Sequence, residues 1–481
     1  MIILATVLIP MALSLAAYAA AKKSPYTAGY ISALALIPLL VVSAYSVFGG
    51  VDITEAAFQG FDILAFRITP FNGLFAFTVA LVGILVAIYS PPYMEHRSQE
   101  VGRDTSLFYL TYGFFLGGLA GAFVAANLIM VYVFIEIALV ASLFQVLYYG
   151  YGDRVRITVM YLVWSHVGAF LVLAGFLLLY LDGTYYVPLL LEGVENAKFP
   201  GPNAVAFLLI LVGSLIKMAA LGVHMWLPYV HAEAPTPLSA LLSPVLVGVG
   251  GYLIAATAMY VLPADSEWAR WLVYYAVATA IYGGLMAYLQ KDVKRLFAYS
   301  TVSQMGYLLL GVALFNPHGY TAAALFYLSH GLGKAVLFMT AGYFIMHLHT
   351  RDIEKMGGLY GWRPELAGAA VVGFLNLAGI LSVGMVSEIV LTVAYAKYFG
   401  KEYLFYIPYA AILLVTGIYA FNTIRVVFFG PHKREDKGPV DLALLAIVAA
   451  AFISLLLFLP PFSSALADNV YKTIEVAKLW K

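Results

Sequence analysis

Residues 128–149, LIMVYVFIEIALVASLFQVLYY, form an uninterrupted apolar stretch with a single charge, Glu136, near its centre. A membrane-spanning helix needs about 20 apolar residues, because each residue rises ~1.5 Å and the hydrocarbon core is ~30 Å thick. A charge at the middle of such a helix costs at least ~2.5 kcal/mol, so an ionisable residue there predicts a function. The stretch therefore predicts a transmembrane helix that carries a functional carboxylate.

Thirteen further stretches of helix length surround this one, and three of them also hold a charge well inside them, at Lys217, Lys334 and Glu388. The 481 residues are 63% hydrophobic and 11% charged, whereas soluble domains contain about 25% charged residues. We predict an all-α polytopic membrane protein with fourteen transmembrane helices, at roughly residues 1–21, 26–49, 70–90, 107–126, 128–149, 157–180, 204–226, 238–261, 269–289, 296–314, 319–347, 366–398, 403–429 and 440–462.

The connections between these helices are short, and we expect no soluble domain among them. Residues 50–67 alternate apolar and polar side chains, which predicts a small hairpin outside the membrane. No basic residue precedes Lys22, so the first helix lacks the charged start of a cleaved signal peptide and is expected to be retained.

Lys and Arg are distributed unequally between the two sides of the predicted membrane. Connections after odd-numbered helices hold about twice as many of them as the opposite side, termini included. Because cytoplasmic loops carry this excess, we predict a multi-pass protein of the cell membrane with both termini outside.

Two of the predicted helices are interrupted. The first break follows Lys217, in the proline-rich run 226–237, which also contains the polar residues His231 and Glu233; the second lies between Gly379 and Gly384, shortly before Glu388. Backbone freed by a break must line protein or a water-filled cavity, and breaks at corresponding places in two halves are typical of inverted repeats in transporters.

Helical spacing indicates which groups could exchange protons. His330 and Lys334 are four residues apart and share a helical face, and Lys217 and His224, seven apart, are expected to return to one face about two turns, or ~10 Å, apart. The alternatives are a Lys side chain that snorkels to the interface and, for the two Glu residues, a buried structural ion pair. His166 is equally consistent with a hydrogen bond between helices.

Composition also excludes several classes of site and partner. The chain contains no cysteine, so it cannot ligate an iron–sulfur cluster or form a disulfide, and any redox centre must sit on another polypeptide. No histidine cluster has metal-ligand spacing and no glycine-rich phosphate loop follows a strand. A net charge of +1 without a basic patch gives no reason to expect nucleic acid.

Four motifs occur in the order seen in a known family. They are HAEAPTPLSAL from residue 231, DVKRLFAYSTVSQMG from residue 292, HGLGK from residue 330 and TRDIEKMGG from residue 350. Over roughly residues 65–430 the chain resembles the antiporter-like subunits shared by respiratory complex I, Mrp-type cation/proton antiporters and membrane-bound energy-converting hydrogenases.

This resemblance implies a domain organisation and a set of site residues. It implies N-terminal helices in residues 1–106, a first five-helix repeat in 107–261, a second, inverted repeat in 268–429 and a last helix with a tail in 440–481, with helices 7 and 12 discontinuous. It also implies that Glu136 and Lys217 form a switchable ion pair, that Lys334 lies on a central hydrophilic axis and that Glu388 is the terminal group. Ion translocation is thus assigned to Glu136, Lys217, His224, His330, Lys334 and Glu388, with His166, His231, Glu233, Ser303 and Gln304 as auxiliary candidates.

The chain departs from the family pattern in three places. Family members usually carry a Lys in helix 8, where the segment LVGVGGY at 246–252 places Gly248. The Pro-Pro of the helix 12 break is replaced by Leu381 and Ser382. The sequence continues for about 20 residues beyond helix 14, which leads us to expect no long lateral helix like that of the distal complex I subunit.

The sequence therefore predicts a proton- or sodium-translocating antiporter-like subunit of a redox-driven membrane complex, such as a membrane-bound hydrogenase, a related sulfur-reducing complex or complex I. Its partners would be other membrane subunits and a peripheral redox module on the cytoplasmic side, whose iron–sulfur or nickel–iron centres belong to those subunits. Moving Glu136 away from Lys217 would release a proton towards His330, Lys334 and Glu388. The alternatives are a subunit of an Mrp-type Na⁺/H⁺ antiporter, a self-contained solute transporter and a non-conducting structural bridge.

Overall fold

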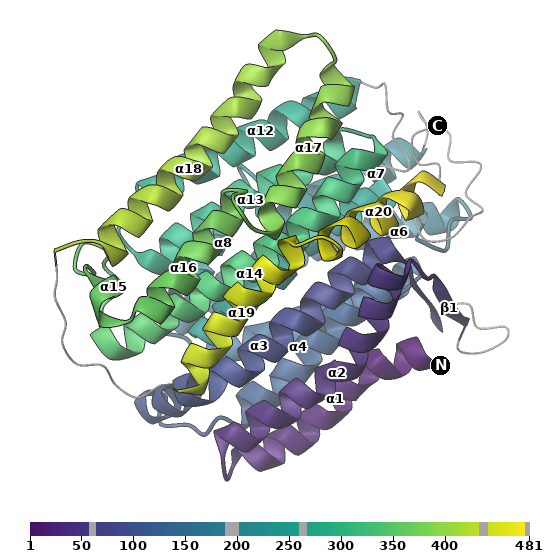
Figure 1. Cartoon of the computed structure of the whole chain (residues 1–481). Coiled ribbons are helices and arrows are strands. Elements are labelled where there is room, and N and C mark those ends of the chain that lie inside the picture. The colour runs from purple at the N-terminus through teal and green to yellow at the C-terminus, as the bar shows by residue number, and fades with distance from the viewer. Residues whose placement is uncertain (57–63, 188–201, 259–266, 432–440, 477–481) are drawn as a thin grey trace.

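The helices of this chain lie side by side in one bundle (Figure 1). The computed structural model describes residues 1–56, 64–187, 202–258, 267–431 and 441–476. In chain order its helices and strands are α1 (Ile2–Ala21), α2 (Pro25–Gly49), β1 (Ile53–Ala56), β2 (Ala65–Ile68), α3 (Pro70–Val101), α4 (Ser106–Val124), α5 (Leu128–Tyr149), α6 (Arg154–Leu181), α7 (Pro202–Lys217), α8 (Trp226–Glu233), α9 (Thr236–Leu241), the π-helical turn η2 (Leu242–Leu246), α10 (Val249–Leu253), the π-helical turn η3 (Ile254–Ala258), α12 (Glu267–Tyr288), α13 (Val293–Ala313), α14 (Pro317–Leu348), α15 (Leu359–Trp362), α16 (Pro364–Leu377), α17 (Val383–Phe399), the 3₁₀ turn η4 (Tyr403–Phe405), α18 (Tyr406–Phe428), α19 (Leu442–Phe458) and α20 (Phe462–Val476).

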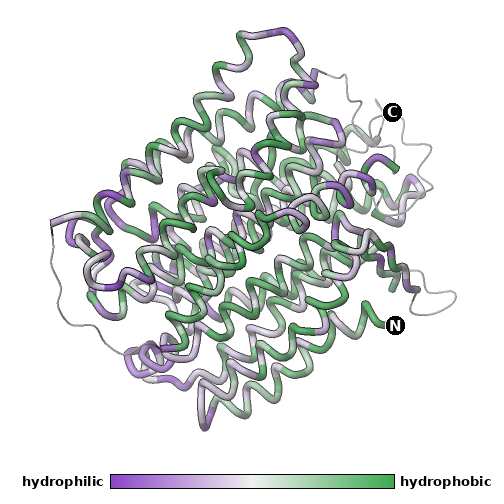
Figure 2. Tube along the Cα trace, in the orientation of Figure 1, coloured by the Kyte–Doolittle hydropathy of each residue, from purple (hydrophilic) through white to green (hydrophobic). Residues whose placement is uncertain are grey.

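Eleven helical segments within the described residues are long and apolar enough to cross a membrane, or twelve if α19 and α20, which are bent by 68°, form one span. Hydrophobic residues follow one another along the helices and hydrophilic residues gather towards the helix ends, as the colours of the trace in Figure 2 show. The chain is thus a multi-pass membrane protein, as predicted. The count of fourteen stays a prediction, and the predicted domain limits at residues 261 and 440 fall outside the described residues.

The hairpin expected between the second and third helices is confirmed. Strands β1 and β2 pair antiparallel with Ile53 opposite Ile68. The carboxylate of Glu55 accepts hydrogen bonds from the main-chain N–H groups of Ile2 (2.6 Å) and Ile3 (2.9 Å), which satisfies two of the free donors at the start of α1. The hairpin therefore fixes the beginning of the chain to this end of the bundle.

Helix α14 and the segment Thr236–Thr257 are the most enclosed of the candidate spans in the described part of the chain. All residues in the apolar 18-residue stretch of α14 are buried, whereas in α1, α6 and α18 only 39%, 39% and 28% of the residues in such a stretch are buried. Helix α14 packs against α3, α13, α16 and α17. A charged residue on α14 is consequently surrounded by protein, while α1, α6 and α18 leave apolar side chains free to face lipid.

Both predicted interruptions are present. Helix α7 ends at Lys217, where the backbone turns through positive φ angles at Ala219 (53°) and Gly222 (86°). Helix α16 ends at Leu377 and α17 starts at Val383, with Gly379 at a φ of 64° between them. Each break thus places free backbone groups beside one of the buried charges.

Candidate functional site

Glu136 lies in the middle of α5 and pairs with a histidine of the next helix. Its Oε2 is 3.3 Å from Nε2 of His166 on α6. The other ring nitrogen of His166, Nδ1, is 3.1 Å from the Leu162 carbonyl oxygen and therefore donates its hydrogen there. Nε2 therefore faces the carboxylate, and an imidazolium there forms an ion pair with Glu136.

The expected ion pair between Glu136 and Lys217 is not formed in this structure. Among the described residues no carboxylate lies within 4.0 Å of the Lys217 ammonium, because Glu136 is turned towards α6 and His166 instead. A cavity of about 20 Å³ adjoins Lys217 and is lined also by Ser165 and Trp226. Such a space is large enough for one water molecule. Ile135 and Ser165, the residues before Glu136 and His166, line the same cavity, so Lys217 lies close to this pair and the carboxylate has two basic neighbours.

Glu136 also reaches the outer surface of the bundle. It lines an apolar groove of about 630 Å³ between α4 and α5, together with Phe114, Val133 and Phe144, whose side chains are 37%, 38% and 41% exposed. The second carboxylate oxygen, Oε1, is buried without a hydrogen-bond partner among the described residues. The acid therefore stands between the interior and a lipid-facing or subunit-facing surface.

The prediction that Lys217 and His224 share a helical face is wrong. Helix α7 ends at Lys217, and the positive φ angles that follow carry His224 away from the helix axis. Its Nε2 instead lies 3.1 Å from the hydroxyl of Tyr282 on α12, and its Nδ1 is buried without a partner in the described part of the chain. His224 thus joins the first break to α12.

His330 and Lys334 lie one helical turn apart in α14, as predicted. The Lys334 side chain is 0% exposed and donates to the Phe297 carbonyl oxygen (2.8 Å) and to the Ser300 hydroxyl of α13. Nε2 of His330 donates to the Ser243 carbonyl oxygen in η2 at 3.1 Å, and Nδ1 has no partner among the described residues. Two polar groups with unused hydrogen-bonding capacity therefore lie at the centre of the molecule.

His231 and Glu233 belong to α8, just before the chain breaks again at Ala234. The His231 ring is 0% exposed and stacks on Phe338 of α14 at 4.8 Å, with neither nitrogen hydrogen-bonded within the described residues. Glu233 is partly exposed at the end of the helix. His231 thus brings a titratable ring against α14, while Glu233 lies nearer the surface.

Glu388 lies in the second turn of α17, and its side chain reaches back to the second break. Its carboxylate lies directly over Gly379, where a Cβ atom would be 2.0 Å from Oε2, and Oε1 is buried without a partner among the described residues. The amide of Asn376 holds the break together, because it donates to the Ser329 carbonyl oxygen (2.7 Å) and accepts from the Gly384 N–H (2.8 Å). The break therefore makes room for the acid.

The two auxiliary candidates on α13 differ in place. Gln304 donates to the carbonyl oxygen of Leu377, the last residue of α16, at 3.1 Å, so it contacts the second break. The Ser303 hydroxyl donates to the Ala280 carbonyl oxygen at 2.8 Å and joins α12 to α13. Gln304 is thus near Glu388, while Ser303 serves the packing of two helices.

Lys294 and Arg97 are buried cations that sequence reasoning does not select. Lys294 is 1% exposed and donates to the carbonyl oxygen of Ala234, which lies between α8 and α9. Arg97 is 7% exposed near the end of α3. Sequence spacing places both only among the loop charges. The one signal for Lys294 is its place inside the motif that starts at Asp292, and Arg97 has none.

Aromatic side chains fill the space beside Gly248, the position in the eighth predicted span where the resemblance implies a lysine. A Cβ atom at Gly248 would lie 2.3 Å from the Tyr327 ring. That ring packs against Phe75 (4.6 Å) and Phe123 (5.5 Å), and its hydroxyl donates to the Val245 carbonyl oxygen. The space beside Gly248 is filled by rings, so no second side chain fits there without repacking.

The family is decided by a match over more than half of the chain. A family model described as "NADH:quinone oxidoreductase/Mrp antiporter, TM" matches residues 125–406, which include every predicted site residue. The chain belongs to this family. Its match begins next to α5 and ends at the start of α18, so both breaks and α14 lie inside the family's shared part.

Individual relatives of this family member come from different kinds of complex. A Na⁺/H⁺ antiporter subunit of Alkalihalophilus pseudofirmus is 31% identical over 427 residues, which cover 80% of this chain and 51% of that protein. The M subunit of the F420H2 dehydrogenase of Methanosarcina mazei is 29% identical over 451 residues, covering 89% and 88%. A chain of the membrane-bound sulfane sulfur reductase, an archaeal respiratory membrane complex, has the same fold, with a TM-score of 0.82, 19% identity and 99% coverage of both chains. The chain spans about half or less of the length of the cation/proton antiporter proteins that it matches.

Proposed function

We propose that the chain is a proton- or sodium-translocating antiporter-like subunit of a multisubunit, redox-driven membrane complex. One observation carries this proposal: inside a multi-pass bundle, ionisable groups occur at the Glu136–His166 pair, at Lys217, at His330 with Lys334 and at Glu388. Four of these side chains have atoms that are buried without a hydrogen-bond partner in the described part of the chain, or lie beside a small cavity. Such groups in a membrane are typical of ion pathways.

The proposal also covers the number of membrane spans, their division into two repeats and the orientation of the chain. If α7 with α8 and α16 with α17 each cross the membrane as broken helices, and α19 with α20 forms one bent span, every span predicted from the sequence has its counterpart and the total is fourteen. The first repeat would then cover residues 107–261 and the second 268–429, each with one break and one ionisable residue beside it. The excess of Lys and Arg after odd-numbered helices favours both termini outside.

The proposed mechanism starts from the two basic neighbours of Glu136. While Glu136 is paired with His166, as here, Lys217 has no carboxylate within ion-pair distance among the described residues. Burial without a counter-charge disfavours a protonated lysine, so this arrangement releases the proton of Lys217, and movement of Glu136 towards Lys217 recharges it. His330, Lys334 and Glu388 would pass the charge on. Because these groups interact, their titration belongs to the set.

The complex is best described as redox-driven. The dehydrogenase subunit of Methanosarcina mazei matches this chain over nearly the full length of both, whereas the antiporter subunit matches over half of its own. The cysteine-free sequence places iron–sulfur or nickel–iron centres in partner subunits, on the cytoplasmic side. An Mrp-type Na⁺/H⁺ antiporter subunit is the nearest alternative.

A second candidate, a non-conducting structural bridge, is favoured by one observation. The rings of Tyr327, Phe75 and Phe123 close the space beside Gly248, where relatives usually carry a lysine. If conduction required that station, the two halves would not be connected.

The test compares ion translocation in the assembled complex, driven by its redox turnover, for the parent, Lys217→Ala and Glu388→Gln. The exposed Lys291→Ala and Glu402→Gln serve as matched controls. We expect at least a tenfold loss in each site variant and less than a twofold change in each control, at equal subunit content. Full translocation by both site variants would favour the structural bridge.

A further inference from the structure

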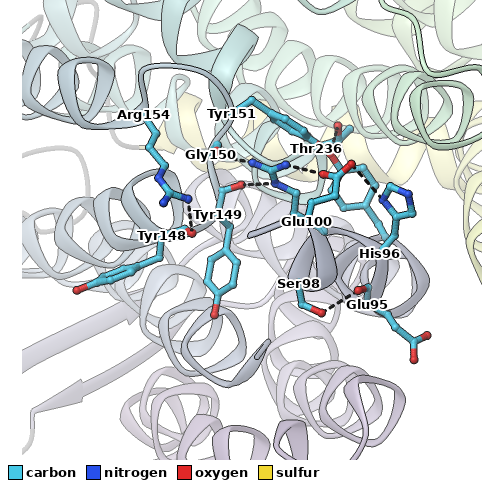
Figure 3. A network of polar contacts seen from close by, with 12 residues as sticks. Glu95, His96, Ser98, Glu100, Tyr148, Tyr149, Gly150, Tyr151, Arg154 and Thr236 are labelled. Atoms are coloured by element: carbon cyan, nitrogen blue, oxygen red, sulfur yellow. Dashed lines mark hydrogen bonds and ion pairs between the residues drawn. The ribbon is translucent and has the colours of Figure 1, made fainter. Parts of the chain in front are cut away.

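Arg97 binds the end of the helix that carries Glu136. Its Nε donates to the Tyr149 carbonyl oxygen at 3.0 Å and its Nη2 to the Gly150 carbonyl oxygen at 2.5 Å (Figure 3). Tyr149 is the last residue of α5, so these carbonyl groups have no partner within their own helix. A buried guanidinium at the negative end of a helix stabilises that end.

Arg97 also fixes the residue that follows. Its guanidinium carbon lies 3.6 Å from the centre of the Tyr151 ring, and its Nη1 pairs with Glu100 at 2.5 Å. The Tyr151 hydroxyl is 2.6 Å from that of Tyr93. Burial raises the pKa of Tyr151, so this hydroxyl stays neutral and available for hydrogen bonding. The arginine, the two tyrosines and the end of α5 form one cluster.

This cluster holds both sides of the junction between α8, which belongs to the first interrupted helix, and α9, which begins the next span. The N–H of Tyr151 donates to the carbonyl oxygen of Glu233, the last residue of α8, at 2.7 Å. The hydroxyl of Thr236, the first residue of α9, donates to the Tyr93 hydroxyl at 3.1 Å. Between them lie Ala234, whose carbonyl accepts from Lys294, and Pro235, which has no N–H.

We infer that Arg97 and Tyr151 are positioning residues that couple the helix of Glu136 to the broken helix that follows Lys217. A shift of α5 that moves Glu136 between its two basic neighbours displaces the Tyr149 and Gly150 carbonyl groups, and the cluster transmits this displacement to α8 and α9. His231, shortly before the break, faces Phe338 of α14. The inference rests on the proposed translocation function.

Arg103 provides a matched control. It lies just beyond the end of α3, is exposed, and contacts the ring of Tyr148 at 4.7 Å, three residues from Tyr151. Like Arg97 it is a cation over a tyrosine of the same segment, but no main-chain carbonyl of α5 is among its hydrogen-bond partners in the described structure. Removing its charge therefore changes local charge without loosening the cluster.

The experiment measures, in the assembled complex, ions moved per turnover of the driving reaction for Arg97→Gln, Arg103→Gln and Lys217→Ala. We expect Arg97→Gln to lower this ratio at least fivefold and Arg103→Gln to change it less than twofold. Poor assembly alone lowers turnover and translocation together and leaves the ratio unchanged. Hydrogen exchange at the Tyr151 amide, which is independent of transport, should rise at least tenfold in Arg97→Gln only.

Two Tyr→Phe variants, which remove only a hydroxyl group, test the coupling role of the cluster if Arg97→Gln fails to assemble. Tyr151→Phe keeps the ring and removes its hydrogen bond with Tyr93, whereas Tyr93→Phe removes that bond and the one from Thr236. Tyr151→Phe should lower the ratio about threefold, Tyr93→Phe at least as far, and the double variant no further than Tyr93→Phe. A parent-like ratio in Arg97→Gln or in both Phe variants, or additive losses, would overturn the inference. Normal translocation by Lys217→Ala would instead refute the proposed function, and the exchange measurement would still judge the cluster.

Discussion

At the scale of single residues, the carboxylate of Glu388 depends on a glycine nine positions earlier. Gly379 has a φ of 64° and lies so close that a Cβ atom there would be 2.0 Å from the carboxylate. A side chain at this position would meet the acid directly. The glycine is therefore part of the site although it contributes no functional group.

Gly379→Ala should impair both stability and transport. The left-handed backbone costs an L-residue roughly 1–2 kcal/mol, and the clash must displace Glu388. We expect a lower thermal midpoint for the purified complex and a loss of translocation similar to that of Glu388→Gln. Gly368→Ala in α16, with no atom within 4 Å of its Cβ position, should leave transport unchanged. A parent-like thermal midpoint and parent-like translocation in Gly379→Ala would show that Glu388 does not depend on a glycine at this position.

Sequence spacing predicts single residues well where they lie on one continuous helix. Glu136 in α5 and the pair His330 and Lys334 in α14 lie in spans as expected. Sequence spacing wrongly predicts the position of His224, because α7 ends at Lys217, several residues before the prolines that signal a break. The pairing of Glu136 with His166 depends on how α5 and α6 face each other, which no spacing within one helix contains.

At the scale of helices, the second break is stabilised by the hydrogen bonds of one buried side chain. Asn376 in α16 contacts the main chain of α14 at Ser329 and of α17 at Gly384. One buried amide thus joins three helices at the place where backbone groups lack their helical partners. The prolines usual in the family break are absent, and this amide satisfies part of the freed backbone.

Asn376→Ala should destabilise the complex by about 1–3 kcal/mol, since a buried N–H and a buried carbonyl would lose their partner. The effect should appear as a lower thermal midpoint and as reduced translocation at equal subunit content. Asn422→Ala, which removes a contact with Arg425 on α18 at the edge of the bundle, should change neither by a measurable amount. Equal midpoints for the two variants would contradict this role of Asn376.

The existence of both breaks could be predicted from proline and glycine, but their boundaries could not. Positive φ angles occur at Ala219 and Leu381, residue types that give no warning of such a turn in the sequence. Helix α20 is likewise missing from the predicted helices. Its buried side chains Leu466, Val470 and Ile474 recur every four residues, which is a helical pattern in a segment that the sequence analysis treats as a tail.

At the scale of the whole molecule, the absence of cysteine makes topology measurable. Any single cysteine introduced is the only thiol in the chain. We expect Lys23→Cys and Lys291→Cys to react with a membrane-impermeant maleimide from the cytoplasmic side, and Lys401→Cys and Lys472→Cys from the outer side. All four positions are exposed or partly exposed, and the positive charges favour that orientation.

Intact and inverted vesicles of the complex provide the comparison. Labelling of Lys23→Cys and Lys401→Cys from one and the same side would contradict the fourteen-helix count as well as the orientation. A cysteine at Ala335, beside the fully buried Lys334, should react from neither side.

Helix α20 joins the last part of the described chain to one of the first. The Asn469 amide donates to the carbonyl oxygens of Val47 (2.9 Å) and Phe48 (3.1 Å) at the end of α2. During synthesis α2 enters the membrane more than four hundred residues before Asn469 is made, so these carbonyl groups lack this partner until the ribosome has passed residue 469. A product truncated before Asn469 would leave the carbonyl groups of Val47 and Phe48 without this amide, so the end of α2 itself would report whether translation had passed residue 469.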